Sequence, residues 1–168
     1  MLEEQSLLLL PWAPRPIQPA PSTQLRRSIL ATFDRRHLGY AGQRRCRFAR
    51  LGWLFPPVLE VCETEDESLL CSLRPGWRFG SCKVRDADGH IVGRLRGQAT
   101  LDQFNQLFAT IKAGQPGGKA RFVAPDGTEL GYVAFSPEGS CLTFGPAIQS
   151  NPFAKMMLLA AVLREQRP

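Results

Sequence analysis

Short segments of alternating hydrophobic and polar residues, separated by turn residues, dominate the chain from Gln24 onward. Alternation with a period of two turns one side of a segment toward a core, which is typical of a strand in an antiparallel sheet. Many short strands separated by turns favour a barrel or a sandwich. We predict strands at residues 24–33, 37–42, 44–51, 56–63, 67–73, 78–85, 90–98, 119–124, 128–136 and 140–145.

One short unit recurs within these segments. An aspartate precedes a glycine by five positions at Asp34 and Gly39, at Asp88 and Gly93, and at Asp126 and Gly131. In the second and third copies another glycine directly follows the aspartate, and the Asp-Gly pair favours a tight hairpin turn. The later glycine falls in the returning strand, where a missing side chain permits a bulge or the close approach of another segment. We interpret the unit as a repeated hairpin.

Residues 100–114 depart from the alternating pattern. Their apolar positions recur at helical spacing, and Thr100 with Gln103 has the form of a capping box. Gly114 then follows as a stop signal. This spacing predicts a short amphipathic helix, with a strand across 104–111 as the alternative.

The C-terminal segment 152–166 is predicted to be a helix. Asn151 suits the N-cap, Pro152 suits the first helical position, and Arg164 and Arg167 lie near the negative end of the helix dipole. No polar side chain occurs from residue 156 to 162, so apolar matter must surround this helix on every side. The residues expected in the core are Phe153, Met156, Met157, Leu158, Leu159, Ala160, Val162 and Leu163.

The apolar part of this helix is too short to cross a bilayer, which needs about 20 apolar residues. We therefore expect no transmembrane span and predict that the helix is enclosed by the protein's own sheet. The predicted fold is mainly β (α+β), a closed antiparallel β-barrel of about 10 to 12 strands around a buried hydrophobic C-terminal α-helix. Its domain covers residues 23–168.

Residues 1–22 are predicted to form a disordered, proline-rich arm. Five prolines lie between residues 11 and 21, and proline removes backbone donors and favours extended conformations. The segment lacks the positive start and the apolar length of a secretion signal. The odd number of cysteines, with no C-x-x-C pair, indicates neither a disulfide framework nor a zinc site. Together these features predict a cytoplasmic protein.

Positive charge is concentrated early in the chain. The formal net charge is +6, and residues 26–50 alone contain eight arginines against the single acid Asp34. A basic surface of this kind favours polyanions such as phospholipid headgroups or nucleic acid. The alternative is a solvated face in a chain that prefers arginine to lysine. The candidate anion-binding residues, chosen from this segment and from the outward side of 90–98, are Arg26, Arg27, Arg35, Arg36, Arg45, Arg47, Arg94 and Arg96.

Motifs for enzymatic chemistry are weak. Asp86 and Asp88 are spaced like the start of a calcium-binding loop, but glycine stands where the bidentate glutamate is needed, so we predict a hairpin turn there. The lysine of residues 114–119 lacks the spacing and the hydroxyl residue of a P-loop. No nucleophile elbow and no Cys-His arrangement is present. We expect a non-catalytic protein without a cofactor or a metal ion.

Four stretches together resemble a known family. They are Val58-Leu-Glu-Val, Leu69-Leu-Cys-Ser-Leu-Arg, Val84-Arg-Asp-Ala-Asp-Gly-His-Ile-Val-Gly93 and the terminal Asn151-Pro-Phe-Ala-Lys-Met-Met-Leu-Leu-Ala-Ala. With the repeated hairpins, this order resembles the phospholipid scramblase and LURP-one-related branch of the tubby C-terminal-like superfamily. The resemblance covers about residues 24–166.

The resemblance implies a closed barrel of about twelve strands around the C-terminal helix, and association with anionic membrane phospholipid or phosphoinositide headgroups. Residues 136–150, before the final helix, contain only Glu138 as an acid, whereas scramblases carry an acidic calcium segment there. Calcium-stimulated scrambling is therefore not expected. The leading hypothesis is a lipid-associating domain, peripheral at the inner membrane surface. Nucleic-acid binding and a protein-interaction scaffold are the alternatives, and the sequence does not indicate an oligomeric state.

Overall fold

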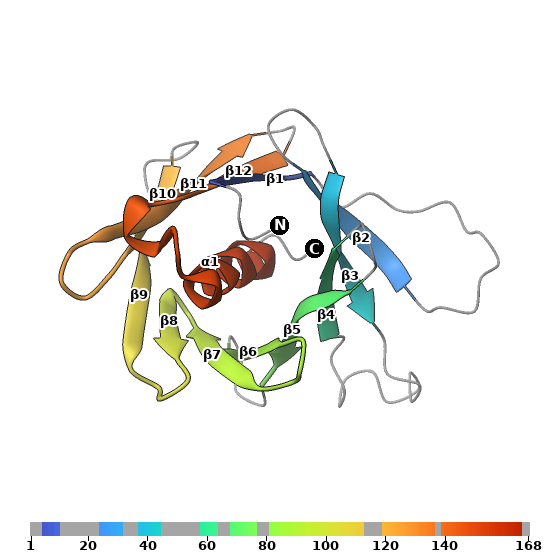
Figure 1. Ribbon diagram of the computed structural model, residues 1–168, viewed down its shortest axis with the longest axis horizontal. Coiled ribbons are helices and arrows are strands. Elements are labelled where there is room, and N and C mark those ends of the chain that lie inside the picture. Colours follow the sequence, from blue (N-terminus) through green and yellow to red (C-terminus); the bar gives the residue numbers. More distant parts are fainter. Residues whose placement is uncertain are drawn as a thin grey trace.

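An antiparallel sheet and one C-terminal helix make up the described part of the protein (Figure 1). The computed structural model describes residues 5–10, 24–31, 37–44, 58–63, 68–76, 81–112, 119–136 and 139–165; for 24–31 and most of 37–44 only the backbone is described. The strands are β1 (Ser6–Leu9), β2 (Gln24–Ala31), β3 (His37–Arg44), β4 (Val58–Glu63), β5 (Leu69–Pro75), β6 (Ser81–Asp86), β7 (Ile91–Arg96), β8 (Ala99–Asp102), β9 (Leu107–Lys112), β10 (Lys119–Val123), β11 (Glu129–Ser136) and β12 (Gly139–Phe144). A 3-10 turn, η2 (Pro146–Ile148), leads into the helix α1 (Pro152–Glu165). The mainly β class with a C-terminal helix is confirmed.

The sheet curls around α1 in a barrel-like shell (Figure 1). From β2 to β12 each strand pairs antiparallel with the next strand along the chain. The first strand pairs with β12 over its full length, from Ser6 opposite Thr143 to Leu9 opposite Ser140. It also meets β2 through two residue pairs. Of the predicted strand 44–51, Arg44 is the last residue of β3, and residues 45–51 lie outside the described residues.

The first strand corrects one prediction. Residues 1–22 were expected to form a disordered arm, but residues 6–9 are a strand of the sheet. The side chains of Leu7 and Leu9 are fully buried, whereas Leu8 between them is only partly buried. The prolines that suggested an arm begin at Pro11, after the strand has ended, and lie outside the described residues.

The repeated hairpin is confirmed. Gly89 and Gly127 adopt the left-handed backbone conformation with φ of 85° and 89°, as an Asp-Gly turn requires. In all three copies the returning strand also contains a bulge directly before the later glycine of the unit, which is Gly39, Gly93 or Gly131. The bulge is seen in the strand register, which skips Leu38, Val92 and Leu130. Each bulge adds one residue to a strand, which bends the strand and increases its twist.

Two further hairpins share this bulge, although the aspartate and glycine spacing does not reveal them. The register skips Leu70 between β4 and β5, and Phe108 between β8 and β9. The residue after the skipped one is Cys71 or Ala109 in place of glycine, and both are fully buried. Among the residues that the structure describes, the bulged hairpin therefore occurs five times, and its bulges supply the curvature that wraps the sheet around α1.

The repeated glycines mark points where the strands approach α1. A Cβ atom at Gly93 would lie 2.5 Å from the carbonyl oxygen of Leu101 and 2.6 Å from Cε of Met157. At Gly131 it would lie 2.5 Å from the carbonyl oxygen of Thr143 and 3.2 Å from Cδ2 of Leu158. Glycine is required at both positions because a side chain would displace backbone of the neighbouring strand.

The predicted helix at 100–114 is wrong: these residues form β8, a turn and β9. Oδ1 of Asp102 accepts hydrogen bonds from the amides of Phe104 at 2.9 Å and Gln106 at 2.8 Å. Asn105 has φ of 62°, a conformation that interrupts a helix. Phe104, one of the apolar positions that gave the helical spacing, is 71% exposed. The alternative of a strand was correct for residues 107–111.

The C-terminal helix is confirmed in position and burial. Oδ1 of Asn151 accepts a hydrogen bond from the amide of Ala154 at 3.0 Å, as expected of an N-cap. Every residue from Ala154 to Leu163 is buried. Phe153 corrects the predicted core, because it is 55% exposed. The predicted core residues that are confirmed are Met156, Met157, Leu158, Leu159, Ala160, Val162 and Leu163.

A lysine is also enclosed with the helix. Lys155 is 1% exposed, and its Nζ lies 5.4 Å from the centroid of the Phe144 ring, which allows a cation–π interaction. At the other end of α1, Arg164 donates hydrogen bonds to the carbonyl of Gly97 and, at 2.7 Å, to Glu165. Within the described residues no helix is long and apolar enough to traverse a bilayer.

Candidate anion-binding face

The outer surface of β5, β6 and β7 carries a concentration of positive charge. In β6, Cys82 and Val84 are buried, so Lys83 between them points outward and is exposed. In β7, Gly93 and Leu95 are buried in the same way. Arg94 is consequently half-buried on the outer face, and Arg96 is exposed. The expected outward direction of Arg94 and Arg96 is confirmed.

The strand register aligns three of these cations. Arg74 of β5 lies opposite Lys83 of β6, and Lys83 lies opposite Arg94 of β7. We call Arg74, Lys83 and Arg94 the basic row. Like charges directly opposite each other on one face of a sheet are destabilising. A bound anion would relieve that repulsion, so the arrangement favours an anionic ligand.

The neighbours of the basic row add little negative charge. Leu101 of β8 lies opposite Arg94, so an apolar residue follows the row at that end. Nη1 of Arg94 donates a hydrogen bond to Oδ1 of Asn105, a neutral acceptor, at 2.7 Å. In the adjacent row Arg85 lies opposite Ser72, and Ser72 lies opposite Glu60. That carboxylate is therefore two strands away from Arg85.

The structure places few of the other predicted arginines. Arg26 and Arg27 lie in β2, for which only the backbone is described. Arg35, Arg36, Arg45 and Arg47 lie outside the described residues. Sequence reasoning missed Arg74 and Lys83, because Arg74 is the single cation of β5, Lys83 shares β6 only with Arg85, and only the strand register places Arg74 and Lys83 beside Arg94.

A second group of cations lies on β9 and β10 and has a different character. Lys112 lies opposite Arg121. Nη1 of Arg121, however, is 3.6 Å from Oε2 of Glu129, and Nζ of Lys119 lies 4.5 Å from the centroid of the Tyr132 ring. These contacts within the protein satisfy part of the charge. The group therefore serves as a comparison for the basic row.

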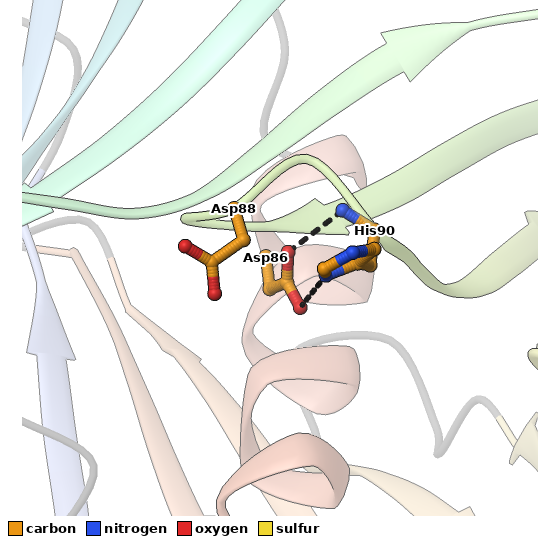
Figure 2. Close-up of side chains that lie close together, drawn as sticks. All are labelled: Asp86, Asp88 and His90. Atoms are coloured by element: carbon orange, nitrogen blue, oxygen red, sulfur yellow. Dashed lines mark hydrogen bonds and ion pairs between the residues drawn. The ribbon is translucent and has the colours of Figure 1, made fainter.

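The hairpin turn between β6 and β7 contains Asp86, Asp88 and His90, whose possible ligand atoms lie within 4.8 Å of one another. Figure 2 shows Asp86 between the other two side chains. Oδ1 of Asp86 accepts a hydrogen bond from the amide of His90 at 2.8 Å, and Oδ2 lies 3.6 Å from Nδ1 of the same residue. These contacts belong to the predicted hairpin turn, and they give both oxygens of the Asp86 carboxylate a partner within the protein.

Cysteine chemistry is disfavoured at the centre of the sheet. Cys71 is fully buried. Burial, followed by the nearby thiols of Cys62 and Cys82, raises the pKa of Cys71 to about 12. Since the thiolate is the reactive form, this side chain is not a nucleophile at neutral pH.

Comparison with known proteins defines the fold. No family model and no curated protein matches this chain. An X-ray structure of a protein from Arabidopsis thaliana is similar to it, with a TM-score of 0.57 and 7% sequence identity. The similarity covers 95% of this chain and 90% of that chain. At this identity the likeness concerns the fold alone.

Proposed function

We propose that the protein is a non-catalytic domain of the tubby C-terminal-like class that binds anionic membrane phospholipid or phosphoinositide headgroups. In this proposal the two residue pairs between β1 and β2 close the barrel, with Leu8 opposite Ala31 and Leu9 opposite Leu30. The enclosed C-terminal helix supports the assignment to this class. The proposed location is the cytoplasm, peripheral to the inner membrane surface.

The basic row carries the proposal of anion binding. It places three cations side by side on the outer face of adjacent strands, with Arg96 exposed on the same face of β7. A cation near the surface of an acidic leaflet contributes about 1 kcal/mol to membrane binding. Three cations acting together would contribute about 3 kcal/mol, which corresponds to a change in partition of about a hundredfold.

Co-sedimentation with vesicles tests this proposal. The unmodified protein is expected to bind vesicles that contain acidic phospholipid or phosphoinositide and to remain in solution with neutral vesicles. The triple variant R74Q/K83Q/R94Q should lose between about tenfold and a hundredfold in partition, because its three cations contribute together. The control K112Q/K119Q/R121Q removes the same net charge from the second cationic group and should lose much less.

Equal losses in the two triple variants would show that net charge alone drives binding and would contradict a site at the basic row. Equal binding to neutral and acidic vesicles would contradict headgroup recognition. Nucleic-acid binding is the second candidate, because the same row would attract a polyphosphate backbone. A competition assay with duplex and single-stranded nucleic acid separates the two: displacement of the protein from acidic vesicles at low concentrations of nucleic acid would favour the second candidate.

A further inference from the structure

A hollow of about 440 Å³ opens beside the start of α1. Residues from the turn between β6 and β7, the turn between β8 and β9, and the first turn of α1 line it. We call it the rim hollow. It is separate from the basic row, whose residues do not line it. Its volume lies in the range typical of sites for small ligands.

The apolar side of the rim hollow is rich in aromatic rings. Phe104, Phe108 and Phe153 line it together with Val92 and Met157. Phe104 is 71% exposed and Phe153 is 55% exposed, and both belong to the small set of large apolar side chains that the described surface exposes. Two exposed phenylalanines from distant parts of the chain at one hollow indicate a surface that an apolar group covers.

The polar side of the rim hollow is acidic. Asp86 and Asp102 line it together with the polar residues His90, Gln103 and Asn151, whereas its lining within the described residues includes neither lysine nor arginine. The side chain of Asp86 is only 19% exposed. In both aspartates Oδ1 accepts the hydrogen bonds of the turn, and Oδ2 of Asp86 lies 3.6 Å from Nδ1 of His90.

We propose that the rim hollow binds a small, soluble organic cation with an apolar body, such as an alkylammonium or an aromatic ammonium compound. The faces of aromatic rings attract cations, most strongly where water is excluded, and substituted ammonium groups are bound in this way. The two carboxylates complement the positive charge. The phenylalanines and Met157 would cover the apolar body, while an anionic or a fully apolar ligand would leave the carboxylates without a counter-charge.

Titration of the full chain with octyltrimethylammonium, followed by calorimetry and by the NMR signal of the Met157 methyl group, tests the proposal. Octanol and octanoate have the same chain length and serve as the neutral and anionic controls. We expect the ammonium compound to bind at least about fivefold more tightly than octanol, since one cation–π contact and one ion pair each contribute about 0.5–1 kcal/mol. Octanoate should bind least.

Conservative variants locate the binding. D86N and D102N keep the oxygen that accepts the turn hydrogen bonds but remove the charge, and each should weaken octyltrimethylammonium binding about three- to fivefold. The matched control is D126N, because Asp126 accepts a hydrogen bond from the amide of Thr128 in another hairpin turn and does not line the rim hollow. F104A should also weaken binding, whereas F135A removes an exposed phenylalanine of β11 and should not.

Tighter binding of octanol or octanoate would overturn the proposal, as would equal effects of D86N and D126N. Binding of phosphatidylcholine vesicles without binding of the soluble ammonium compound would identify the occupant as a membrane surface and would also overturn it. The unchanged basic row in these variants makes the result independent of the proposed headgroup binding.

Discussion

Leu159→Asp is expected to abolish cooperative folding. Leu159 is fully buried in the middle of α1, where all residues from Ala154 to Leu163 are enclosed by the sheet. A carboxylate there would lose its hydration in place of a fully buried leucine, which costs several kcal/mol. The buried Lys155 lies one turn earlier on α1, and an ion pair with it would offset only part of that cost. The total stability of a domain is about 5–15 kcal/mol. Thermal unfolding followed by circular dichroism should show no cooperative transition.

The matched control lies on the same helix. Phe153→Asp introduces the same side chain at an exposed position in the first turn, where a negative charge is favourable beside the helix N-terminus. Its melting temperature should stay close to that of the unmodified protein. Similar melting curves for the two variants would contradict the enclosure of α1.

Leu7→Ala is expected to lower the free energy of unfolding by about 2–5 kcal/mol, the usual cost of removing a buried leucine side chain. Leu7 is fully buried, and its strand β1 joins β12 to β2. The adjacent Leu8 is only partly buried, so Leu8→Ala should cost much less. Chemical denaturation of the two variants measures the difference. Equal, small losses would mean that the first strand contributes little and that residues 6–9 behave as the arm that the sequence indicated.

Local chemistry explains which elements the sequence predicted well. An uninterrupted apolar run behind an Asn-Pro start has few alternatives to a buried helix, and α1 begins at Pro152 as expected. Asp-Gly pairs specify tight turns, and Gly89 and Gly127 have the required positive φ.

The errors arose where spacing was ambiguous. Leu101, Phe104 and Phe108 fit a helical period, but the carboxylate of Asp102 forms a turn between two short strands instead. The four residues of β1 are too few for their alternation to stand out beside the prolines that follow. The apolar run of the sequence includes Phe153, but the first two residues of α1, Pro152 and Phe153, are exposed, and burial begins at Ala154.

The candidate site was only partly predictable. Alternation placed Arg94 and Arg96 on the outer face, but it does not tell which residues of neighbouring strands lie opposite them. The bulge at Val92 changes the register between β6 and β7 and so helps determine the partners along these strands. Arg74 and Lys83 therefore became candidates only when the pairing of the strands was known.

Paramagnetic relaxation in acidic nanodiscs with spin-labelled headgroups tests the central claim most directly, namely that the outer face of β5 to β7 meets the membrane while α1 stays enclosed. We expect the amide signals around Arg74, Lys83 and Arg94 to broaden most, with weaker effects on β9, β10 and α1. Strongest broadening in α1 would mean that the helix enters the bilayer, and strongest broadening around Lys112 and Arg121 would place the contact on the other cationic group. Either result would contradict this account.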